Sequence, residues 1–212
     1  MDTQQDHLED IKQIRSIMER SSKFLTLSGF SGIFAGIAAL IGVATAYWHF
    51  NIAFTDNGFY KLAKTSKGEL NSDFYNFLLI DIGLVLLSSL LVSFLMTFKK
   101  AKQQSQPIWD ATAKRLLINI LIPLFVGAVY CLILLYHGLL SLIAPATLLF
   151  YGLALLNASK YTLNYVIYLG IGQILIGLTS AYFIDYGLVF WALGFGVLHI
   201  IYGIVMYLKF DK

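Results

Sequence analysis

The sequence contains little charge, a single cysteine and three prolines. Charged residues make up 13% of the 212 positions, about half the share that is usual in soluble domains. Because Cys131 is the only cysteine, the chain can form neither an internal disulfide nor a cysteine-based metal cluster. The net charge of +3 argues against a nucleic-acid-binding module, which carries a strongly basic surface. The low share of charged residues also argues against a soluble single domain.

Long apolar runs are what the chain has in abundance. Apolar residues make up 58% of it, which excludes a disordered chain. A helix needs about 20 such residues to cross a hydrocarbon core about 30 Å thick, and six runs of this length are present. They span residues 24–49, 74–98, 116–136, 138–157, 161–183 and 186–208. The sequence therefore predicts an all-α fold, a polytopic membrane protein with a six-transmembrane-helix bundle over residues 24–208.

The charged residues are segregated from these runs and are unequal on the two sides. Of the 27 charged residues, 26 lie outside the runs, in segments too short to fold a catalytic domain of their own. Twelve of the fifteen lysines and arginines lie on one side. The other side carries Lys61, Lys64 and Lys67, all in the connection 51–73, whose glycines and asparagines predict irregular structure. Because cytoplasmic connections are rich in Lys and Arg, both termini are expected in the cytoplasm, with residues 209–212 as a tail.

Two segments outside the runs are candidate contact surfaces. An amphipathic cytoplasmic helix is predicted over residues 1–23, because apolar side chains recur there at helical spacing. These side chains are Leu8, Ile11, Ile14 and Met18. This helix either lies on the membrane or the bundle, or binds a protein partner or a second copy of the chain. The 99–115 connection either contacts anionic headgroups or docks a cytoplasmic protein. Its basic residues are Lys99, Lys100, Lys102, Lys114 and Arg115.

Small residues recur along one face of the first and last runs. They are Ser28, Gly32 and Gly36 in the first run and Ala192, Gly196 and Gly203 in the last. Small side chains at this spacing let two membrane helices approach closely. The favoured interpretation is helix packing within the chain, and homo-oligomerisation through the first run is the alternative.

A few polar residues inside the runs form a candidate intramembrane polar site. Asp81 is the only charged residue within a run, and a carboxylate in hydrocarbon costs several kcal/mol unless it is paired, hydrated or protonated. Tyr130, at similar depth in the antiparallel third run, is its predicted hydrogen-bond partner. Gln173 and His199 lie at comparable depth in the last two runs and are predicted to interact. Asp81 is either a structural hydrogen-bond anchor, or a group reached by interfacial water, or a proton- or cation-coupling site. His199 is either a satisfied core histidine or a proton relay.

No sequence motif indicates catalysis. The chain lacks the HExxH zinc motif, the nucleophile elbow, the Walker A loop and a dinucleotide fingerprint in the required context. Its four histidines are too scattered for a metal site, and no cofactor is expected. The leading hypothesis is a non-catalytic binding or regulatory membrane component that uses the N-terminal helix and the basic connection. The alternative is a small transporter or channel, possibly proton-coupled, with Asp81 and His199 along its path.

Two stretches resemble an uncharacterised family of six-span inner-membrane proteins from Bacteroidota. They are ERSSKFLTLSGFSGIFAGIAALIG at 19–42 and GFGVLHIIYGIVMYLKF at 194–210. The resemblance covers the first and last runs, and it extends to the middle of the chain only in hydropathy. It implies a location in the bacterial cytoplasmic (inner) membrane. It implies no activity and no site residue.

Overall fold

The computed structural model describes residues 28–54, 56, 58–103 and 109–210. The described part of the chain is helical, and its only extended pairing is an isolated bridge between Lys64 and Leu70. The all-α prediction is confirmed for this part. The expected N-terminal helix, with Leu8, Ile11, Ile14 and Met18, lies outside the described residues, as does the middle of the basic connection.

The described residues form five long helical stretches and one shorter helix. The elements are α2 (Gly29–His49), η1 (Phe59–Ala63), α3 (Ser72–Gln103), α4 (Ala111–Tyr136), η2 (Leu140–Leu142), α5 (Ile143–Ala158), η3 (Ser159–Tyr161), α6 (Val166–Tyr182), η4 (Ile184–Tyr186), α7 (Gly187–Trp191), the π-helical segment η5 (Ala192–Leu198) and α8 (His199–Phe210). Elements α7, η5 and α8 run on without a break and are called the last rod below.

Within the described part of the chain, five stretches are long and apolar enough to cross a membrane. They are Gly29–His49, Ser72–Gln103, Ala111–Tyr136, Leu140–Tyr161 and Ile184–Lys209. The apolar helix α6 has 17 residues, which is about 25 Å at about 1.5 Å per residue. It is shorter than the predicted fifth run because Thr162 has an extended backbone, so the helix begins only at Val166.

Two helices extend beyond the apolar runs into polar sequence. Helix α3 continues through lysines to Gln103, consistent with the good helix propensity of lysine and alanine. Helix α4 begins at Ala111 because the Asp110 carboxylate accepts a hydrogen bond from the Ala113 amide at 2.6 Å. This is an N-cap, which satisfies one of the free amides of the first turn.

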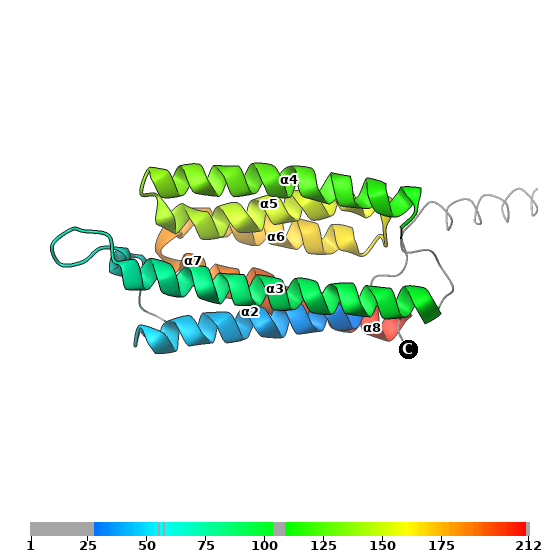
Figure 1. Cartoon of the computed structure of the whole chain (residues 1–212), viewed down its shortest axis with the longest axis horizontal. Helices are drawn as coiled ribbons and strands as arrows, with labels where there is room; N and C mark the ends of the chain where they lie inside the picture. The colour runs from blue at the N-terminus through cyan, green and yellow to red at the C-terminus, as the bar shows by residue number, and fades with distance from the viewer. Residues whose placement is uncertain (1–27, 55, 57, 104–108, 211–212) are drawn as a thin grey trace, which may run out of the picture.

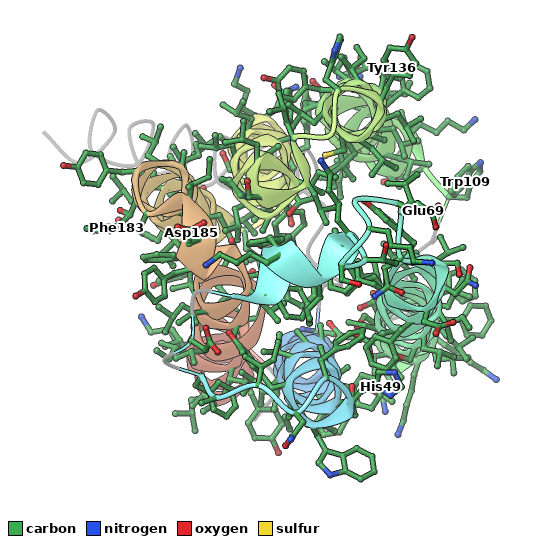
Figure 2. All side chains as sticks on the ribbon, turned by 90° about the vertical axis from the view of Figure 1, so that its left-hand side faces the viewer. His49, Glu69, Trp109, Tyr136, Phe183 and Asp185 are labelled. Carbon is green, nitrogen blue, oxygen red and sulfur yellow. The ribbon has the colours of Figure 1, made fainter. Side chains whose placement is uncertain are left out.

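The helices lie side by side and form an open arc with α3 and α4 at its two ends (Figures 1 and 2). Helix α3 packs on α2, and α2 packs on α8 and η5. Helix α6 packs between η5 and α5, and α4 packs on α5. In the described part of the chain, α3 and α4 share no extensive interface. None of the residues in the most apolar stretch of α3 is buried, and few are buried in that of α4. An uncovered apolar surface of this extent is compatible with a lipid environment.

The connection between α2 and α3 covers one end of the arc. Element η1 lies over the middle of this end in Figure 2. Phe59 and Ala63 are buried there with Ala46 and Phe74, and the side-chain amide of Asn71 donates to the Leu62 carbonyl at 2.9 Å. The prediction of irregular structure is wrong only for η1, which buries Phe59, and residues 64–71 are turns and irregular backbone as predicted. Burial also raises the pKa of the Tyr60 phenol on η1.

Glycines bring α2 and the last rod into close contact. A side chain on Gly203 would place its Cβ 2.5 Å from the Ile33 amide nitrogen and 2.7 Å from the Gly29 carbonyl oxygen. A Cβ on Gly36 would lie 2.6 Å from the Gly196 carbonyl oxygen, and one on Gly32 would lie 3.2 Å from the Gly203 Cα. Ser28 and Ala192, by contrast, are only partly buried. The glycine face of α2 is thus covered by the same chain.

Replacing Gly203 by alanine is expected to destabilise the bundle by about 1–3 kcal/mol, because the added methyl group meets the backbone of α2. Gly83→Ala is the matched control, since a Cβ at Gly83 in α3 has nothing within 4 Å. It should leave stability unchanged or raise it slightly through better helix propensity. Unfolding of the detergent-solubilised protein in dodecyl sulfate, followed by circular dichroism, measures both. Equal midpoints for the two variants would contradict close packing at Gly203.

Candidate functional site

A buried polar cluster joins α5, α6 and the last rod. It consists of Tyr151, Gln173, His199 and the carbonyl of Gly194, and is called the His199 cluster. Gln173 Nε2 donates to the Gly194 carbonyl at 2.9 Å and lies 3.2 Å from His199 Nδ1. His199 Nδ1 is 3.0 Å from the same carbonyl, and its Nε2 is 2.9 Å from the Tyr151 hydroxyl. The structure thus brings Gln173 and His199 into contact.

The π-helical segment η5 shapes the cluster. Its wider turns space hydrogen-bonded groups five residues apart, which is the separation between Gly194 and His199. Gly194 has no side chain, and a Cβ there would lie 2.6 Å from Gln173 Oε1. The glycine therefore leaves the room that the amide of Gln173 occupies. Phe195, also in η5, stacks on the His199 ring with centroids 5.8 Å apart.

The cluster can hold a neutral imidazole in either tautomer. With the proton on Nδ1, His199 donates to Gly194 and accepts from Tyr151; with the proton on Nε2, it donates to Tyr151 and accepts from Gln173. Gln173 is fully buried, and its Oε1 has no hydrogen-bond partner. The arrangement therefore accommodates a neutral imidazole in which each ring nitrogen has a hydrogen-bond partner, whichever nitrogen carries the proton.

Asp81 lies in a second polar site, near the end of the arc that η1 covers. Its Oδ1 accepts from the Thr45 hydroxyl of α2 at 3.0 Å, and this hydroxyl also lies 2.8 Å from the Gly42 carbonyl. A Cβ on Gly42 would be 3.1 Å from Asp81 Oδ2, so the glycine again makes room for a polar side chain.

The predicted pairing of Asp81 with Tyr130 is wrong. Asp81 bonds to α2, because α3 packs on α2 and shares no extensive interface with α4. Tyr130 is 45% exposed, and its ring packs against Phe150 of α5 with centroids 5.7 Å apart. The structure also keeps the Asp81 and His199 sites apart, since α3 and α8 pack on different parts of α2.

Basic residues from separate segments gather at the other end of the arc, called the basic end. It lies at the right of Figure 1, where α3, α5 and α8 finish and α4 and α6 begin. Its residues are Lys99, Lys100 and Lys102 of α3, Lys114 and Arg115 of α4, Lys160 of η3 and Lys209 of α8. The Lys209 ammonium group donates to the Tyr165 hydroxyl at 2.8 Å. The opposite end carries Lys61, Lys64 and Lys67.

Sequence reasoning missed Thr45 and Tyr151. Thr45 lies one turn before the end of the first run, at a depth like that of Asp81, so equal depth on neighbouring helices was an available signal. Tyr151 lies in mid-run, away from the ends where membrane tyrosines concentrate. Among the described residues, no group of three or more histidines, cysteines or acidic residues could hold a metal ion.

Three comparisons with known proteins were made with the chain. No protein-family model, no curated protein and no solved structure matched it.

Replacing Gln173 by methionine keeps the side-chain length and removes both amide donors. The free energy of unfolding is expected to fall by about 1–3 kcal/mol, because the cluster loses a buried donor. Thr179→Val is the control, since Thr179 is exposed on the same helix and its hydroxyl donates to the Leu175 carbonyl of that helix. The same dodecyl sulfate titration reads both variants. A Gln173→Met midpoint equal to that of the control would contradict the role of the amide.

Proposed function

We propose that the chain is a six-span protein of the bacterial cytoplasmic (inner) membrane, with both termini in the cytoplasm. In this proposal it acts as a non-catalytic binding or regulatory component through a cytoplasmic face. That face combines the basic end with the N-terminal segment 1–23. The observation that carries the proposal is the gathering of lysines and arginines from α3, α4, η3 and α8 at one end.

The uncovered apolar surfaces support the membrane part of the proposal. Helices α3 and α4 leave almost all of their most apolar stretches unburied, and lipid tails are the solvent that such surfaces favour. Helix α6 is short for a span, at about 25 Å. A short helix can still span where the bilayer thins locally, at a modest energetic cost. Its packing between α5 and η5 favours this interpretation.

The charge of the basic end supports the binding part. Five exposed or partly exposed basic side chains flank the short connection between α3 and α4. A cluster of this kind attracts anionic lipid and acidic protein surfaces, at about 1 kcal/mol per basic residue near an anionic membrane. The connection is too short to fold by itself. The connection is therefore expected to act by contact with a partner and not by catalysis.

A photo-crosslinking amino acid in place of Lys102 is expected to capture a cytoplasmic protein in living cells, identified by mass spectrometry. The same amino acid in place of Lys67, at the opposite end, is the matched control and should capture none. Adding Lys99→Gln and Arg115→Gln should lower the yield at position 102 several-fold, because the attraction is electrostatic. Cytoplasmic adducts at position 67 would reverse the orientation, and no adduct at either position would contradict the binding role.

A proton-coupled transporter or channel is the second candidate, and the Asp81 site favours it. The Thr45 hydroxyl has one proton but two acceptors within 3.0 Å, Asp81 Oδ1 and the Gly42 carbonyl. When Asp81 is protonated, it can donate to Thr45 while Thr45 donates to Gly42, so both contacts become hydrogen bonds. When Asp81 is ionised, only one of them can form. The site is thus suited to binding and releasing a proton.

Purified protein in liposomes should dissipate an imposed pH gradient several-fold faster than the Asp81→Asn variant, if this second candidate is right. The variant cannot release the proton that the site would carry. Asp73→Asn, in the exposed first turn of α3, is the matched control and should behave as the original chain. A pH-sensitive dye inside the liposomes gives the rate. A rate for the original chain equal to that of protein-free liposomes would eliminate this candidate.

A further inference from the structure

We propose that a hollow between α4 and α5 at the basic end binds one anionic phospholipid. The hollow has a volume of about 330 Å³ and is lined by Pro123, Leu153, Leu156, Asn157 and Lys160. In this site Lys160 holds the phosphate group, and the proline and leucines hold the upper part of an acyl chain. The inference rests on the proposed membrane setting and adds a specific ligand site to it.

The hollow is built around a helix interruption. Pro123 lies inside α4 and has no backbone N–H, so the Asn119 carbonyl four residues earlier lacks its usual donor. The side-chain amide of Asn157, from α5, donates to this carbonyl at 3.1 Å. The Asn119 side chain in turn donates to the Arg115 carbonyl at 2.8 Å. These bonds hold the two helices in register where the hollow opens.

The two walls have the polarity of a phospholipid. Leu153, Leu156, Asn157 and Lys160 follow at intervals of three, one and three residues, so they share one face of α5 and its continuation. On α4, Arg115, Asn119 and Pro123 follow at intervals of four, and η3, which carries Lys160, packs against α4. Each wall is thus apolar toward the middle of the bundle and cationic about 10 Å nearer the basic end.

The positive charge at the rim of the hollow favours an anionic lipid as its ligand. Lys160 and Arg115 are exposed at the outer rim of these walls, and an ammonium or guanidinium group there suits a phosphate oxygen. Basic pockets between membrane helices on the cytoplasmic side are known to bind anionic headgroups. The volume lies near the lower end of the range for small-molecule sites, about 300–1,000 Å³. It suits a headgroup with part of one chain.

Native mass spectrometry of the detergent-solubilised full chain tests the site, with phosphatidylglycerol as the probe and phosphatidylcholine as the neutral comparison. The original chain should retain phosphatidylglycerol in preference. Lys160→Gln should lower this retention about fivefold. Lys67→Gln, which removes the same charge from an exposed position at the opposite end, is the matched control and should leave it unchanged. Leu153→Ser should also lower retention, whereas Leu121→Ser, at an exposed position of α4 outside the hollow, should not.

Equal retention by Lys160→Gln and Lys67→Gln would overturn the proposal. Displacement of the lipid by free glycerol phosphate would also overturn it, because that result indicates a site for a soluble phosphate. Glycerol phosphate has no acyl chain for the apolar wall and is expected not to compete. Flotation of the original chain with liposomes separates this test from the broader proposal. A chain that does not float refutes the membrane setting itself, whereas a floating chain with no preference for phosphatidylglycerol refutes only the lipid site.

Discussion

The close approach of α2 and the last rod is the contact on which the rest of the bundle depends. Gly203 lets the backbone of the last rod meet the backbone of α2 near Ile33, and Gly36 does the same beside Gly196. In lipid there is little hydrophobic drive between helices, so van der Waals contact at short range has to replace it. Because α2 then holds α3 on another face, this contact positions both Asp81 on α3 and His199 on α8.

Two helix interruptions are stabilised in the same way. At η5 the Gly194 carbonyl accepts from the amide of Gln173 on α6. In α4 the carbonyl freed by Pro123 accepts from the amide of Asn157 on α5. A backbone group without a partner is costly in an apolar interior, so each interruption requires a donor from a neighbouring helix. At both places a side-chain amide from a neighbouring helix bonds to a backbone carbonyl.

The polar groups divide the molecule along its length. Asp81 and Thr45 lie near the end that η1 covers, the His199 cluster lies in the middle region, and most of the described lysines and arginines lie at the basic end. Each interior site is made possible by a glycine, Gly42 for Asp81 and Gly194 for Gln173. Because the chain has few charged residues, their positions are the main guide to its functional surfaces.

The sequence by itself determined the helical class, the apolar stretches, the segregation of charge and the comparable depth of Gln173 and His199. Composition and the length of the apolar runs determine the first three. Depth follows because each residue of a helix adds a known rise, so the depth of a side chain can be counted along the sequence. Only the tertiary structure decided which helices are neighbours. Depth allowed Tyr130 to pair with Asp81, but α3 packs on α2, and Thr45 is the partner. Neighbour choice depends on side-chain packing between distant segments, which no local pattern records.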